Sequence, residues 1–301
     1  MDASGDFEDL SYQIKDINYQ RPAYIGPYSI VYRGCWKNKY VAVKVLQIVE
    51  GCNLRTMRRK IKRERTVWIM LDHPNILPLF GYAEKDERFQ PLGAFISPWC
   101  QYGTAPAFLA SHGNSLETMS RIELWNGVIS GVQYLHQYDP CLVHGDLKPS
   151  NILIDENLNP RICDFGLVAI FLEADEAGLM TTSPHTGTER YLSPELVICD
   201  DAPQISMESD IYALGCIGLE FVFSLLPYHH RQNCRPGMII RDILRGVEPA
   251  IRPPGQDSFM DLIWDIVERC LSREPSQRPL AEDVSFWMET VLSTADILLT
   301  V

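Results

Sequence analysis

The sequence predicts an α+β fold with two lobes, a small β-rich lobe that contains one helix and a larger, mainly helical lobe. Short β-type runs dominate up to about residue 100, and helical periodicity dominates after Gly103. This change sets the lobe boundary. We therefore expect an acidic tail at 1–11, a first lobe at 12–99, a second lobe at 100–295 and a C-terminal tail at 296–301.

The strands of the first lobe are predicted from runs that are rich in β-branched and aromatic residues. Asn38 and Lys39 are the expected hairpin turn between the first two strands. In the second strand three valines alternate with Ala42, Lys44 and Leu46, so that Lys44 lies on the face opposite the valines. The predicted strands cover 27–36, 40–48, 76–84 and 93–99.

One helix is predicted at 53–71, between the second and third strands. Its apolar residues recur at steps of three and four, as on one face of a helix. Glu64 falls in the gap between Ile61 and Trp68 on this apolar stripe, so its carboxylate points inward and needs a partner. Lys44 is the candidate partner, either in a functional ion pair or in a structural salt bridge.

The second lobe is predicted to be built from helices. The apolar stretch 211–228 is long enough for a membrane span, but it contains Glu220, follows Asp210 and has no basic flank. We therefore expect a buried helix there and no membrane span. The predicted helices cover 104–112, 119–139, 208–225, 237–246, 258–271 and 280–295.

Composition excludes several classes of function. The chain is 46% hydrophobic and 22% charged, which is typical of a globular protein, and its net charge of −12 argues against nucleic acid as a partner. Its nine cysteines form no C-x-x-C pair, and the histidines show no metal spacing with them. We expect free thiols in a reducing compartment and hence a cytoplasmic protein.

The segment VHGDLKPSNIL, residues 143–153, contains the most promising polar cluster. Asp146, Lys148 and Asn151 lie between two apolar runs, so strands hold the loop that displays them. Thirteen residues after Asn151 comes Asp164, in the tripeptide Asp-Phe-Gly. Asn151 and Asp164 offer an amide and a carboxylate oxygen, which suit Mg²⁺.

Taken together, these motifs resemble the eukaryotic protein kinase family, over nearly the whole chain from Tyr19 to Thr290. DHPNILPLFG (72–81) and GTERYLSPE (187–195) are most similar to the tyrosine-kinase-like group, and HGDLK is similar to fungal members of it. The resemblance implies a two-lobed protein kinase fold, phosphoryl transfer, ATP and Mg²⁺ as cofactors, and a protein substrate. It rests on VAVK (41–44), Glu64, HGDLKPSN (144–151), DFG (164–166), SPE (193–195), Asp210 and Arg278.

By this resemblance, Lys44 holds the nucleotide phosphates and Glu64 fixes Lys44. Asp146 orients the attacking hydroxyl and accepts its proton, and Lys148 neutralises charge on the transferred group. The metal ligands are Asn151 and Asp164. The residues implied in nucleotide binding are Tyr24, Gly26, Val31, Ala42, Lys44, Ser97 as gatekeeper, Pro98 and Cys100 in the hinge, and Leu153.

Further residues match the stack that links the two lobes of a kinase, although ordinary core packing would give the same pattern. Asp210 matches the anchor of this stack. Its members are Trp68, Leu79, His144 and Phe165.

Two features depart from the family pattern. In the glycine-rich loop, Tyr24 and Ser29 replace two glycines and only Gly26 remains, which predicts a stiffer loop. Gly145 stands where many kinases have an arginine that pairs with a phosphorylated activation loop. That loop, 164–195, has its hydroxyl residues at Thr181, Thr182, Ser183, Thr186 and Thr188.

The helix around Glu64 offers another source of positive charge. We hypothesise that it replaces the missing arginine, or that it docks an acidic partner or the acidic tail; the alternative is a solvated helix face. Its basic residues are Arg55, Arg58, Arg59, Lys60, Lys62, Arg63 and Arg65.

The sequence supports three hypotheses about function. The first is an ATP- and Mg²⁺-dependent serine/threonine kinase, favoured by the intact polar set and by Lys148 and Thr188, which are serine/threonine-type features. The alternative is a pseudokinase that acts as a binding or scaffold module, favoured by the damaged glycine-rich loop. Tyrosine or dual-specificity transfer is the third, and Lys148 argues against it.

Overall fold

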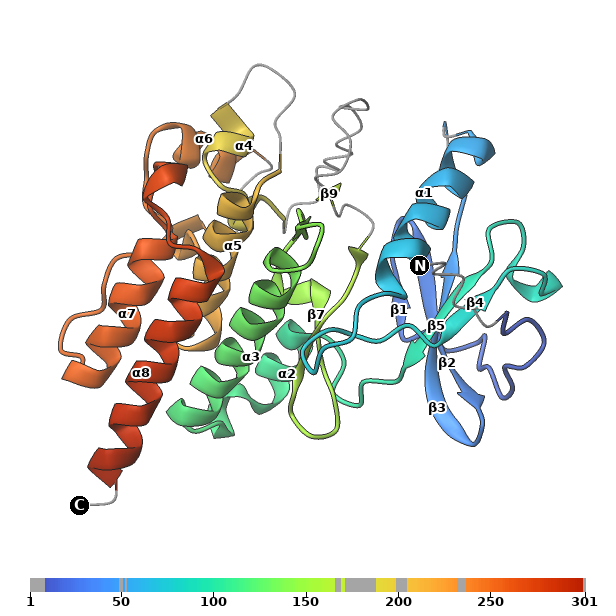
Figure 1. The fold of residues 1–301 in the computed structure, drawn as a ribbon, viewed down its shortest axis with the longest axis horizontal. Coiled ribbons are helices and arrows are strands. Elements are labelled where there is room, and N and C mark those ends of the chain that lie inside the picture. Colours follow the sequence, from blue (N-terminus) through green and yellow to red (C-terminus); the bar gives the residue numbers. More distant parts are fainter. Residues whose placement is uncertain are drawn as a thin grey trace.

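The two-lobed α+β fold predicted from the sequence is confirmed in a computed structural model of the chain (Figure 1). The structure describes residues 9–48, 51, 53–165, 169–170, 188–198, 205–231 and 237–299. A β-sheet and one helix form the first lobe, and helices form most of the second, as Figure 1 shows.

The first lobe is an antiparallel sheet with the strand order β1-β2-β3-β5-β4. The β2–β3 turn is made by Lys37 and Asn38, both at positive φ, with Trp36 paired to Lys39; the turn predicted at Asn38 and Lys39 is therefore displaced by one residue. Of the predicted strand at 76–84, Gly81–Ala83 joins the sheet as β4, and Ile76 forms an isolated bridge with Ile162. The strands are β1 Tyr24–Ile25, β2 Ser29–Trp36, β3 Lys39–Leu46, β4 Gly81–Ala83 and β5 Ala94–Pro98.

The helix of this lobe, α1 Leu54–Trp68, begins at Asn53, whose side chain accepts the N–H of Arg55. It packs on the sheet face that carries Lys44. Val67 and Trp68 in its last turn are buried. Glu64 faces the sheet, as its place in the apolar stripe predicts.

The opposite face of the sheet is covered by residues 9–17, an N-terminal strap. Leu10 and Ile14 are fully buried there against Val41 and Val43 of β3. Leu10 is therefore packed and Asp9 bridges to Tyr82, which corrects the prediction of a loose tail for that end of 1–11; residues 1–8 lie outside the described part of the chain.

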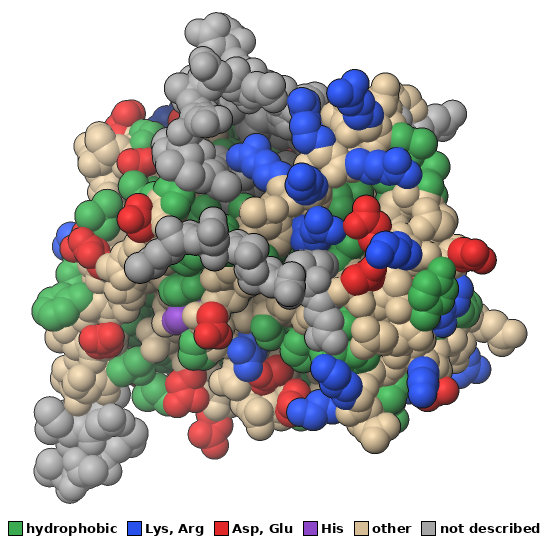
Figure 2. Space-filling view, turned by 45° about the vertical axis from the view of Figure 1, so that its right-hand side comes forward, with side chains coloured by type: hydrophobic (Ala, Val, Ile, Leu, Met, Phe, Trp, Pro, Cys, Tyr) green, Lys and Arg blue, Asp and Glu red, His purple; other side chains and the backbone are tan. Residues whose placement is uncertain are grey.

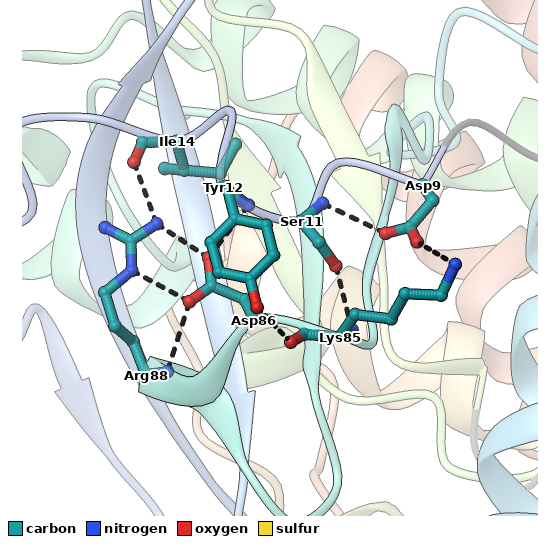
Figure 3. A network of polar contacts seen from close by, with 7 residues as sticks. All are labelled: Asp9, Ser11, Tyr12, Ile14, Lys85, Asp86 and Arg88. Carbon is teal, nitrogen blue, oxygen red and sulfur yellow. Dashed lines mark hydrogen bonds and ion pairs between the residues drawn. The ribbon is translucent and has the colours of Figure 1, made fainter.

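Polar contacts fasten the strap to the segment after β4 (Figure 3). The backbone N–H of Tyr12 donates to the buried Asp86 carboxylate at 3.0 Å, and the Tyr12 hydroxyl donates to the Lys85 carbonyl at 2.8 Å. Arg88 binds Asp86 through two nitrogens and donates to the Ile14 carbonyl at 3.1 Å. These hydrogen bonds with Arg88 are the main reason that the pKa of Asp86 is lowered.

The second lobe is organised around α5, Met207–Phe221, which is buried along most of its length. The Glu220 carboxylate inside this apolar helix accepts the Tyr191 hydroxyl at 2.7 Å, which explains how a carboxylate is tolerated there. Among the helices that the structure describes, none is long and apolar enough to span a bilayer. The other helices are α2 Ala105–His112, α3 Thr118–His136, α4 Glu195–Ile198, α6 Met238–Leu244, α7 Ser258–Cys270 and α8 Ala281–Leu299.

Two short ribbons lie where the lobes meet and carry the loops of interest. Strand β6, Leu142–Val143, pairs with β9, Ala169–Ile170, and β7, Ile152–Ile154, pairs with β8, Pro160–Ile162. At the other end of the lobe, α8 continues to Leu299. The predicted C-terminal tail, which was placed at 296–301, thus begins within this helix.

We predict that the strap stabilises the first lobe. Substituting Leu10→Ala removes a fully buried side chain, and we expect the free energy of unfolding in urea to fall by about 2–4 kcal/mol. The control is Leu54→Ala on α1, where the leucine is exposed and the loss should be below about 0.5 kcal/mol. Equal losses in the two variants would show that the strap contributes no packing.

Candidate active site

Lys44 on β3 stands at the centre of a charged cluster between the lobes. Its Nζ lies 3.2 Å from Oδ1 of Asp164 and 3.7 Å from Oε1 of Glu64. Burial by itself would lower the pKa of Lys44, but these two carboxylates outweigh burial and raise it. The ammonium group is therefore charged and held between two carboxylates from different parts of the chain.

The two carboxylates differ in environment. Lys44 is the main cause that lowers the pKa of Asp164, and 47% of the Asp164 side chain is exposed toward the space between the lobes. Glu64 is only 11% exposed, and its Oε1 has no hydrogen-bond partner within the described residues. Burial raises the pKa of Glu64 to about 7, because Lys44 offsets the cost of desolvation only in part.

The loop 144–151 brings together three of the predicted residues. Lys148 donates to both carboxylate oxygens of Asp146, at 2.9 and 2.7 Å. The side-chain amide of Asn151 donates to the Asp146 backbone carbonyl at 2.8 Å and to its carboxylate at 3.1 Å. The Asp146 side chain is therefore held from two directions.

The β7–β8 ribbon places Asn151 beside the chain that leads to Asp164. Ile152 pairs with Ile162, and the N–H of Cys163 donates to the Asn151 carbonyl at 2.9 Å. The two predicted metal ligands thus lie at one end of the same ribbon. Gly166, the last residue of the Asp-Phe-Gly tripeptide, lies outside the described residues.

His144 connects this loop with the rings that link the lobes. Its Nδ1 accepts the Asp146 N–H at 3.2 Å, and its Nε2 lies 3.1 Å from the Cys163 carbonyl, which requires the proton on Nε2. The ring centroid of His144 lies 5.6 Å from that of Phe165, which in turn lies 5.8 Å from that of Trp68. Leu79 packs against the hydrophobic core to which Trp68 and Phe165 belong.

Asp210, at the start of α5, accepts the backbone N–H groups of two consecutive loop residues. These are His144 at 2.7 Å and Gly145 at 3.0 Å. The ring of His136, at the end of α3, lies 3.1 Å from the same carboxylate. Sequence reasoning missed His136; its place in the last turn of a predicted helix, eight residues before His144, was the available signal.

Gly145 has a φ of +78°, in the left-handed region that residues with a Cβ rarely adopt. The glycine that departs from the family pattern therefore suits the backbone at this position. The loop keeps its shape without an arginine there.

The nucleotide-binding residues named from the sequence line the cleft face of the sheet and the hinge. Val31 pairs with Lys44, and Ala42 pairs with Ser97, so these four side chains share the face that carries Lys44. Leu153 of β7 approaches from the second lobe, where Thr104 bridges to it. Pro98 ends β5, and Cys100 is buried beyond it.

The tip of the glycine-rich loop is covered by its own tyrosine. The N–H of Gly26 donates to the Ser29 carbonyl at 2.9 Å, which closes a tight hairpin. A Cβ at Gly26 would lie 2.6 Å from the Tyr24 ring, so this ring rests directly on the loop. Tyr24 therefore occupies space that a glycine would leave open.

Most of the hydroxyl residues of the predicted activation loop are not described by the structure. Thr181, Thr182, Ser183 and Thr186 lie outside the described residues. The 3-10 turn at Thr188–Tyr191 follows them. Beyond it, Arg278 binds Glu195 of the SPE motif through two nitrogens, each 2.7 Å from a carboxylate oxygen.

With this geometry established, the similarities to known proteins become informative. The model of the family described as "Protein kinase domain" matches residues 25–286. The chain belongs to the protein kinase family.

Among curated proteins, the kinase chain is 30% identical over 262 residues to a putative serine/threonine-protein kinase/receptor of Acanthamoeba polyphaga mimivirus, covering 86% of this chain and 14% of that protein. It is 27% identical to the Dual specificity protein kinase shkC of Dictyostelium discoideum (94% and 53% covered). It is also 27% identical to the Serine/threonine/tyrosine-protein kinase HT1 of Arabidopsis thaliana (84% and 61%). The chain thus spans between about one seventh and three fifths of these relatives' lengths.

We predict that the protonation of Glu64 limits the use of ATP at low pH. The pKa of Glu64 is raised to about 7, so the carboxylate that helps to hold Lys44 becomes neutral as the pH falls through this value. We expect kcat/KM for ATP to fall between pH 8 and pH 6, with Glu64→Gln low and flat over this range. An unchanged pH profile in Glu64→Gln would assign the titration to another group.

Proposed function

We propose that this chain transfers the γ-phosphoryl group of ATP to serine and threonine hydroxyls of protein substrates, with Mg²⁺. The observation that carries the proposal is the Asp146 carboxylate, held by Lys148 and Asn151, in a chain whose Lys44 contacts Asp164. These are the charges that phosphoryl transfer requires, and they come from both lobes.

The donor set fits a magnesium site. Asp164 offers a half-exposed carboxylate and Asn151 an amide oxygen, and Mg²⁺ typically takes one or two such protein ligands with the remainder from phosphates and water. No cluster of three or more His, Cys, Asp or Glu side chains that could hold a metal occurs among the described residues. When bound, Mg²⁺ would neutralise charge on the phosphate oxygens.

The residues of the chain would then act as follows. Lys44 would bind phosphate oxygens, and Glu64 would keep it oriented. Asp146 would orient the substrate hydroxyl and accept its proton as the oxygen attacks the phosphorus atom. Lys148, already 2.7 Å from Asp146, would neutralise the charge on the transferred group.

The serine/threonine preference is supported by Lys148, two residues after Asp146. The names of the Dictyostelium and Arabidopsis relatives include tyrosine or dual specificity, so acceptor choice needs a direct measurement. We also place the chain in the tyrosine-kinase-like group and in the cytoplasm. The latter is supported by the six cysteines that the structure describes, all free thiols.

We predict that the purified chain incorporates phosphate from Mg-ATP into itself or into generic serine/threonine substrates. Lys44→Met and Asp146→Asn should each lower the rate about 100-fold or more, because each removes a group that acts in the transfer. Acid hydrolysis of the product identifies the acceptor residue. Incorporation by the unsubstituted chain no greater than by Asp146→Asn would refute the proposal.

The pseudokinase alternative is supported by one observation, the Tyr24 ring that rests on Gly26. A pseudokinase would incorporate no phosphate in this assay. A rise in Tm with ATP but no transfer would identify a nucleotide-binding module, since a ligand that binds the folded state stabilises it. The absence of both would indicate a scaffold that does not bind nucleotide.

We further propose that the basic face of α1 docks an acidic partner. Figure 2 shows lysine and arginine side chains gathered over α1, on a chain whose net charge is −12. Because α1 also carries Glu64, a partner bound there would act on the helix that holds Lys44. The exposed residues of this face are Arg55, Arg58, Arg59, Lys60, Lys62 and Arg63.

Neutralising Arg58, Arg59 and Lys62 together to glutamine should weaken the binding of an acidic peptide, such as a glutamate-rich or phosphoserine peptide, at least fivefold. The matched control is the triple substitution of Lys39, Arg241 and Arg245, which are also exposed but lie on other elements. If the two triple variants bind the peptide equally, α1 has only a solvated charged face.

A further inference from the structure

The ladder between β3 and β5 ends at the hinge between the lobes. Its last register pair is Val41 with Pro98. Phe80 donates to the Ile96 carbonyl from the side of β4, so by alternation position 98 faces away from β3, and the missing N–H of proline removes no bond from this ladder. The next bond to β3, from the Trp99 N–H to the Tyr40 carbonyl, is long at 3.4 Å.

Arg33 lies beside this weak end of the ladder. It pairs with Ala42 across β2 and β3, which places its side chain on the cleft face with Ala42 and Lys44. Its guanidinium carbon lies 4.7 Å from the ring centroid of Tyr40 and 5.9 Å from that of Trp99. These distances are within the range of cation–π attraction.

The two rings that Arg33 contacts belong to the two residues joined by the long hydrogen bond. Arg33 therefore bridges β3 and the hinge through side chains at the point where the backbone ladder ends in a long hydrogen bond. No ion pair between described residues involves Arg33, so its aromatic contacts are the interactions that define its position.

We propose that Arg33 is a positioning residue for the adenine site. By contacting the Tyr40 and Trp99 rings, it fixes the hinge backbone on either side of Trp99. Those neighbours are Pro98, whose carbonyl would accept from the adenine amine, and Cys100, whose N–H would donate to the ring. The inference rests on the proposed use of ATP.

The test compares Arg33→Gln, which keeps a polar side chain but removes the charge, with Arg33→Lys, which keeps a cation. Arg33→Gln should raise both KM for ATP and Kd for Mg-ADP about fivefold, as expected from the loss of two exposed cation–π contacts, and leave kcat within about twofold. Arg33→Lys should recover most of the affinity, because its ammonium group can also lie over the rings. Arg21→Gln, an exposed arginine outside the strands, is the matched control.

A second arm tests whether Arg33 acts through the hinge. Trp99→Leu should weaken Mg-ADP binding to a similar degree, and Arg33→Gln should add little to it, because the two substitutions remove one shared contact. Additive effects of the two substitutions would overturn the inference. So would an unchanged Kd in Arg33→Gln, or equal losses in Arg33→Gln and Arg33→Lys.

The outcome for the unsubstituted chain separates a failure of the proposed function from a failure of the role proposed for Arg33. If it binds no Mg-ADP, the proposed function fails and the inference fails with it. If it binds Mg-ADP and Arg33→Gln binds equally well, only the role of Arg33 is refuted.

Discussion

The carboxylate of Asp210 is the contact on which the geometry of the site depends. It is almost fully buried, and it accepts the backbone N–H groups of His144 and Gly145 while the His136 ring lies 3.1 Å away. A buried carboxylate is costly unless it is hydrogen-bonded, so the loop and the carboxylate constrain each other. The base of this arrangement is rigid, because α5 is buried along most of its length and begins with a capping box between Ser206 and Ser209.

Two sets of contacts connect Asp210 with the rest of the site. Along the chain, a fixed backbone at 144–145 fixes Asp146, which Lys148 and Asn151 then hold from the sides. Across the lobes, the rings of His144, Phe165 and Trp68 form a continuous stack that ends on α1. Glu64 lies on that helix, one turn before Trp68, so the position of α1 sets the distance between Glu64 and Lys44.

Gly145 can be understood within the same geometry. Its φ of +78° is a conformation that glycine adopts without strain, so replacing arginine there removes a charge but does not distort the loop. What is lost is a cation near the activation loop. The hypothesis that basic residues of α1 replace this cation concerns a loop that lies largely outside the described residues.

Much of the fold and the site could be predicted from the sequence, because periodicity and spacing carry that information. The inward direction of Glu64 followed from the apolar stripe around it, and the predicted helices of the second lobe match the observed ones to within a few residues, while the short α4 was not predicted. The predictions failed where contacts between distant parts of the chain determine the local structure. The strap was missed because two buried residues, Leu10 and Ile14, are too few to show a period, and their burial depends on a sheet face formed by distant strands.

The same limit applies to the residues that were missed in and near the site. His136 has only its place at the end of a predicted helix as a signal and Arg33 has none, since the first contacts Asp210 and the second contacts rings from another strand and the hinge. The β2–β3 turn was displaced by one residue because Lys37 and Asn38 both adopt positive φ, which lysine rarely does.

The most direct test of this account is the turnover of Asp210→Asn. The substitution replaces one carboxylate oxygen with an NH₂ group that cannot accept a backbone N–H, so one loop N–H loses its partner while the side-chain volume is kept. We predict that kcat falls about 10- to 100-fold, as expected when a hydrogen bond to a charged group is lost, with KM for ATP changed less than about twofold and the chain still folded by circular dichroism. A folded Asp210→Asn chain that turns over at the unsubstituted rate would contradict the account.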